Sequence, residues 1–189
     1  MAETYRRARR SLEAASEQSS VEELLEMLQL IEALQRELDP EEWNKARLRP
    51  PASAEARARL AAEVEVVPAA LEALYRWHDG SPEEYTDLYG IDAIGTGRLL
   101  SIEEALSFRE RTRGIRKDFS PTHLPYVAVN GGADLHVVET ARGPVFGWRG
   151  LWDHEISDPI ELEEPLALAI RLGLEMSLPT EQSGYGSKT

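Results

Sequence analysis

The segment Pro68–Ser81, PAALEALYRWHDGS, predicts a short helix that ends in a sharp turn. Proline suits the first turn of a helix, because its φ angle is already helical and no N–H is needed there. Apolar residues continue to Tyr75 and Trp77, and the polar run His78-Asp79-Gly80 then breaks the pattern. Two interpretations remain for Trp77: a core residue, which we favour, or an aromatic anchor for a partner.

The chain before this segment is predicted to be mostly helical. Ser20 with Glu23 three residues later forms a capping box, and apolar side chains then recur at helical spacing over residues 20–38. Asp39-Pro40 ends this helix. Its apolar face can pack on a core or on a partner helix, and we favour the core. Residues 1–18 are interpreted as a polar, partly helical arm.

Extended and helical stretches are predicted to alternate around the opening segment. Trp43 and Pro50-Pro51 are expected in an extended stretch that leads to a helix near residues 54–65. Residues 78–97 are interpreted as a long surface loop with one short strand around Tyr89–Ile94. Ser101 with Glu104 is a second capping box, which opens a helix to about Arg113.

From Leu124 onward the apolar pattern changes to that of β-strands. Strands are expected at residues 126–129, 135–139, 145–148 and 156–162, with turns at 130–132 and 141–144. Pro165 is placed in the first turn of a final helix, about 163–172, with Gly173 as its C-cap. The predicted fold class is α+β: N-terminal helices, a mostly antiparallel sheet and a C-terminal helix in a single domain.

Length and composition are those of an ordinary globular protein. The chain has 189 residues, of which 42% are hydrophobic and 29% charged, enough for one domain with a sizeable core. Apolar runs are too short to span a bilayer, and the basic N-terminus is not followed by the apolar stretch of a secretory signal. The chain has no cysteine, which fits a reducing compartment. We therefore predict a cytoplasmic protein that does not bind membranes.

The net charge of −13 is unevenly distributed. Residues 1–50 carry a net charge of −3 and residues 51–189 carry −10. Such an acidic body repels phosphate backbones, so nucleic acid is an unfavourable partner. It attracts a basic protein and accelerates their encounter. The alternative interpretation is that the acidic surface serves solubility alone.

The sequence lacks the common catalytic and cofactor motifs. The four histidines occur singly, without the spacing of a zinc site. The chain also lacks a Gly-x-Ser-x-Gly elbow and a glycine-rich phosphate loop. We predict no catalytic residue, no metal and no cofactor.

The order of several short motifs resembles the SUKH superfamily, which includes bacterial toxin-immunity proteins and yeast cell-wall synthesis regulators. The motifs are Trp43, Pro50-Pro51, Val67-Pro68, Asp79-Gly80, Leu99-Leu100-Ser101, Gly131-Gly132-Ala133-Asp134 and Gly143-Pro144-Val145. The resemblance covers about residues 43–173. It implies an α+β domain at 43–178, preceded by a helical extension at 1–42 and followed by a disordered tail at 179–189.

The resemblance also implies a function, which is protein binding without catalysis. The first hypothesis is an immunity protein that binds and neutralises a basic, nuclease-type toxin. The cleft of such a toxin binds phosphate groups, and acidic side chains can imitate them. The second is a regulatory adaptor of the same fold that binds a cellular protein. The third is an enzyme that uses the loop carboxylates or His78.

Aromatic residues ringed by carboxylates are suited to bind a basic protein. The candidate protein-binding residues are Trp77, Asp79, Glu83, Glu84, Tyr85, Asp87 and Tyr89, with Trp152 and Asp153 on a second rim. For the loop carboxylates, the alternative role is solvation alone.

Overall fold

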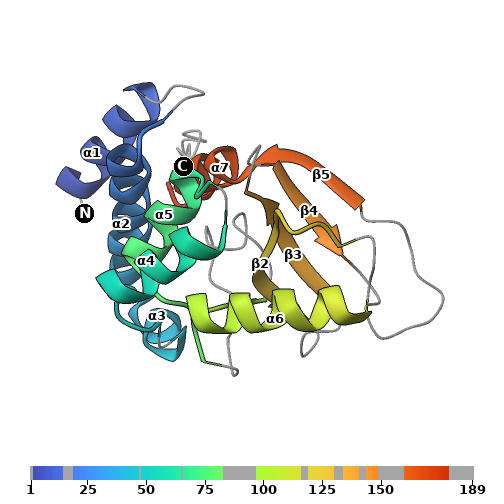
Figure 1. Ribbon diagram of the computed structural model, residues 1–189. Coiled ribbons are helices and arrows are strands. Elements are labelled where there is room, and N and C mark those ends of the chain that lie inside the picture. Colours follow the sequence, from blue (N-terminus) through green and yellow to red (C-terminus); the bar gives the residue numbers. More distant parts are fainter. Residues whose placement is uncertain are drawn as a thin grey trace, which may run out of the picture.

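In the computed structural model, the N-terminal helices gather on one side of the protein and the β-sheet lies on the other, with the helix after the first strand running beside the sheet (Figure 1). The structure describes residues 2–14, 19–46, 48–64, 66–82, 97–115, 119–129, 134–140, 144–148 and 160–178. The helices are α1 (Ala2–Ala14), α2 (Val21–Leu38), α3 (Pro40–Ala46), α4 (Ala54–Glu63), α5 (Ala69–Trp77), α6 (Ile102–Ile115) and α7 (Leu166–Met176). The strands are β1 (Arg98–Leu99), β2 (His123–Val129), β3 (Asp134–Glu139), β4 (Pro144–Trp148) and β5 (Ile160–Pro165). The predicted α+β class is confirmed.

The five strands form one antiparallel sheet in the order β1-β2-β3-β4-β5. Each strand pairs with its neighbour in the chain, as in a meander. The register shifts between Pro125 and Val127 in β2. Proline has no N–H to give to the ladder, so a bulge beside it is the expected adjustment. The sheet is therefore built from contacts between consecutive segments.

Helix α2 lies at the centre of the helical side and begins as the sequence predicts. The Ser20 hydroxyl accepts the Glu23 N–H at 3.2 Å, and the Glu23 carboxylate accepts the Ser20 N–H at 2.7 Å. The apolar face of α2 is buried against α1, α5 and α7. This confirms that the face packs on the core. The predicted boundary after residue 42 therefore separates elements that share one hydrophobic core.

Two features before residue 50 differ from the sequence predictions. The predicted polar arm is the helix α1, which docks on α2 and buries Ala8 completely. Pro40 ends α2, as expected, and also begins α3, since proline fits the first helical position. Trp43 consequently lies in a helix and is buried, where an extended stretch was predicted.

The last helix also differs from its predicted bounds. Pro165 ends β5, and α7 starts one residue later. Gly173, predicted as the C-cap, lies inside α7 and is buried. Its carbonyl accepts the Ser177 hydroxyl at 2.8 Å. Gly173 therefore does not end the helix, which continues to Met176, and the C-cap prediction is wrong. The predicted tail at 179–189 lies outside the described residues.

The turn after α5 brings the backbone of Gly80 against the start of α6. Gly80 has a φ of +81°, which favours glycine. A Cβ atom there would lie 2.5 Å from the Ser101 nitrogen and 2.7 Å from the Leu100 carbonyl carbon. Both are backbone atoms, so neither can rotate out of the way. The packing of this turn therefore requires a residue without a side chain.

We expect Gly80→Ala to lower the free energy of unfolding by about 2–4 kcal/mol, because it adds both backbone strain and a backbone clash. Gly114→Ala is the matched control, since a Cβ atom added to Gly114 on α6 would meet nothing within 4 Å. The control should be neutral or stabilise by up to ~1 kcal/mol. Urea denaturation of both variants tests this, and equal effects at the two positions would contradict it.

Candidate functional site

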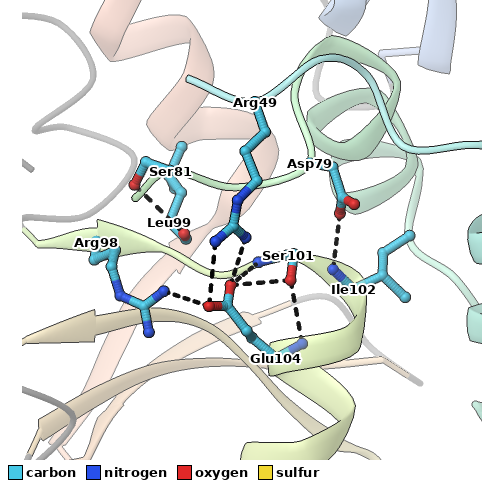
Figure 2. A network of polar contacts seen from close by, with 8 residues as sticks. All are labelled: Arg49, Asp79, Ser81, Arg98, Leu99, Ser101, Ile102 and Glu104. Atoms are coloured by element: carbon cyan, nitrogen blue, oxygen red, sulfur yellow. Dashed lines mark hydrogen bonds and ion pairs between the residues drawn. The ribbon is translucent and has the colours of Figure 1, made fainter. Parts of the chain in front are cut away.

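A partly buried carboxylate at the start of α6 joins this helix to strand β1 and to a stretch about 55 residues earlier (Figure 2). Glu104, in the first turn of α6, accepts hydrogen bonds from two arginines. Arg49 Nη1 lies 2.8 Å from Oε2, and Arg98 Nη1 lies 2.7 Å from Oε1. Arg49 comes from the stretch between α3 and α4, and Arg98 from β1. We call this set, with Ser101 and Asp79, the Glu104 network.

The same network caps the N-terminus of α6. The Ser101 N–H and hydroxyl both donate to Glu104 Oε2 at 2.9 Å, and the Glu104 N–H donates to the Ser101 hydroxyl at 3.2 Å. This is the predicted capping box. Asp79 Oδ1 accepts the Ile102 N–H at 2.9 Å. A carboxylate and a hydroxyl thus satisfy N–H groups that a helix start leaves without partners.

Backbone hydrogen bonds tie the turn after α5 to its neighbours on both sides. The Arg49 N–H donates to the Gly80 carbonyl, and the Asp79 N–H to the Pro50 carbonyl, both at 3.0 Å. The Ser81 N–H donates to the Leu99 carbonyl at 2.9 Å. Ser81 and Leu99 lie just outside the two ends of residues 83–96, which we call the acidic segment. The described residues that flank the acidic segment in the sequence, Ser81 and Leu99, are therefore hydrogen-bonded to each other.

The Glu104 carboxylate is held in its charged form. Burial raises its pKa, but the hydrogen bonds from Arg49, Ser101 and Arg98 outweigh burial and lower the pKa to about 2. Both oxygens of the carboxylate are occupied by these donors. A carboxylate so engaged is suited to fix the geometry of its neighbours, and has no oxygen left for proton transfer to a substrate.

A second carboxylate anchors the end of α5 to α2. Glu32 accepts a hydrogen bond from Trp77 Nε1 at 2.8 Å, forms an ion pair with Arg36 at 2.6 Å, and lies 3.3 Å from His78 Nε2. Hydrogen bonding to His78 is the largest cause that lowers the pKa of Glu32 to about 2. His78 Nδ1 faces the carbonyl oxygen of Arg49 at 2.5 Å. Arg49 thereby connects this cluster to the Glu104 network.

Two of the residues predicted to bind a partner have structural positions instead. Trp77 is only 3% exposed, so the core interpretation holds and its ring is not available as a surface anchor. Asp79 caps α6. The other seven lie outside the described residues: Glu83, Glu84, Tyr85, Asp87, Tyr89, Trp152 and Asp153. The structure therefore describes the base that supports the predicted site.

Sequence reasoning did not place Arg49 or Arg98 at the site. The capping box linked Glu104 to Ser101, because those residues are three positions apart. Arg49 precedes Glu104 by 55 positions, and no local pattern pairs them. The one indication in the sequence was that Arg49 precedes Pro50-Pro51 and Arg98 precedes Leu99-Leu100-Ser101, two of the motifs that carry the family resemblance.

Neither a metal site nor a membrane-spanning helix is found within the described residues. No group of three or more His, Cys, Asp or Glu side chains there could hold a metal ion. No described helix combines the length and the apolar character needed to cross a membrane. No protein-family model matches the chain, and no curated protein matches its sequence.

Replacement of Glu104 by Gln should remove the charge and keep an acceptor for the capping box. We expect a loss of about 2 kcal/mol at pH 7, because two arginines lose their counter-charge. Since the folded-state pKa is below the unfolded value of 4.5, the wild-type advantage is full above about pH 4.5 and declines as the pH falls towards 2.

Denaturation curves of wild type and variant between pH 2 and 7 measure this difference. Glu103→Gln, on the same helix turn but exposed, is the matched control and should change stability by less than ~0.5 kcal/mol. A Glu104→Gln effect that is equally large at pH 2.5 and pH 7 would show that the charge is not its cause.

Proposed function

We propose that this protein is a non-enzymatic, SUKH-type protein-binding domain, and specifically an immunity protein that neutralises a basic, nuclease-type toxin. The proposed contact residues are Glu83, Glu84, Tyr85, Asp87 and Tyr89 in the acidic segment. Trp152 and Asp153 are proposed as a second rim. The observation that carries the proposal is the hydrogen bond between Ser81 and Leu99, the described residues on either side of the acidic segment, which lie beside the Glu104 network.

The base supports this proposal because a binding element needs a fixed attachment. The Ser81–Leu99 hydrogen bond joins two described residues that flank the segment in the sequence, and Gly80 packs its backbone against the start of α6. The Glu104 carboxylate binds two arginines, Arg49 from the stretch between α3 and α4 and Arg98 from β1, and so fixes these segments to the start of α6. Binding residues carried by a chain segment on a firm scaffold are the common arrangement of protein recognition sites.

The distribution of charge at the base also supports a basic partner. Arg49, whose N–H donates to the Gly80 carbonyl, and Arg98, which precedes Leu99, both donate to Glu104. Asp79 also acts on Arg49, so two carboxylates balance the charge of the two arginines within the base. The acidic segment carries four carboxylates and no Lys or Arg. A partner with a cationic cleft can pair with carboxylates of this kind, as it does with phosphates.

The test is capture of a partner from native lysate, followed by kinetics with the purified partner. A variant with Glu83→Gln, Glu84→Gln and Asp87→Asn removes three charges from the segment. We expect a basic nuclease whose activity the wild-type protein inhibits at a one-to-one ratio. The association rate should fall roughly tenfold in the variant, and also between 0.05 and 0.5 M salt.

The matched control removes three charges elsewhere, by Glu41→Gln, Glu55→Gln and Glu103→Gln, at exposed positions on α3, α4 and α6. It should retain most of the wild-type association rate. Equal losses in the two variants would assign the effect to net charge alone. A captured housekeeping protein without toxic activity would favour the regulatory adaptor, and substrate turnover by the purified protein would overturn the proposal.

A further inference from the structure

The outer face of α7 carries a row of apolar side chains. One face of this helix packs on α2 and α5, through Leu166, Ala169, Ile170, Gly173 and Leu174. On the opposite face Leu168 is 37% exposed and Met176 is 59% exposed. Leu172 lies between them and is partly exposed. Residues four apart lie only about 40° apart around a helix, so these three form one row.

Two opposite charges border one edge of this row. Arg171 is partly exposed and Glu175 is exposed. At about 100° per residue, both lie on the same side of the line from Leu168 to Met176. The surface is therefore apolar along its middle, with a cation and an anion along one border.

This arrangement is complementary to itself in one orientation. In an antiparallel pair of α7 helices centred on Leu172, a two-fold axis brings Leu168 of one copy to Met176 of the other. The same axis places the charged borders side by side. At a rise of about 1.5 Å per residue, Arg171 then lies within about 3 Å, along the helix axis, of Glu175 in the second copy. A parallel two-fold pair puts the charged borders on opposite sides and forms neither ion pair.

We propose that two copies of this chain associate through their α7 helices, antiparallel and two-fold symmetric, with Leu172 at the centre. The contact is weak. Three partly exposed side chains per copy fall far short of the roughly 800 Å² per partner of a standard interface. The net charge of −13 on each copy also opposes association. Dimerisation therefore appears at high protein concentration and strengthens with salt, which screens the overall repulsion.

Sedimentation equilibrium up to millimolar protein, at 0.05 and 0.5 M salt, measures this association. The full-length protein should form dimers, with a higher association constant at 0.5 M salt. Met176→Lys should lower that constant at least about tenfold, because each dimer loses the contact twice. Val66→Lys is the matched control: it replaces a side chain that is 51% exposed and makes the same charge change away from α7. It should leave association unchanged.

Charge reversal tests the orientation. Arg171→Glu alone and Glu175→Arg alone place like charges across the contact, so each variant should dimerise more weakly than wild type. An equimolar mixture of the two should form heterodimers, because positions 171 and 175 of one variant are both acidic and those of the other are both basic. A monomeric wild type at both salt concentrations would overturn the proposal. The proposal would also be overturned if Met176→Lys left the association constant unchanged, or if the mixture associated no more strongly than either variant alone.

Discussion

The Glu104 carboxylate links the helical part of this protein to its β-sheet. It receives Arg49 from the helical side and Arg98 from the first strand, and it caps the helix that packs on β2. A partly buried charge of this kind is stable only while all its donors are present, since loss of one leaves charge uncompensated in a low dielectric. The turn that precedes the acidic segment, the start of α6 and strand β1 consequently depend on one another.

Features encoded locally could be predicted from the sequence. Both capping boxes, at Ser20 and Ser101, form as expected, because their partners lie three residues apart. The apolar spacing of α2 predicted its buried face. Strands β2, β3 and β4 were located by their apolar pattern, and β5 overlaps the strand predicted at 156–162, whereas β1 was not predicted. These features together were sufficient for the α+β class.

Features that depend on distant residues could not be predicted. Pro40 follows the end of one helix and begins another, and whether a second helix forms there depends on the burial of Trp43 in the core. Gly173 was mistaken for a helix end because no local pattern shows that α7 continues past it to Met176. The hydrogen bonds of Trp77 and Asp79 also depend on distant partners, Glu32 and the Ile102 N–H. Two residues predicted to bind a partner thus have structural positions.

The Ser81–Leu99 hydrogen bond has a consequence for how such a protein can diversify. It closes the chain on either side of the acidic segment, so the rest of the fold does not depend on how many residues lie between. The entropic cost of a closed flexible segment rises by only about 0.6 kcal/mol for each doubling of its length. Insertions, deletions and exchanges between residues 83 and 96 are therefore cheap for folding. Such changes leave the contacts of the Glu104 network in place.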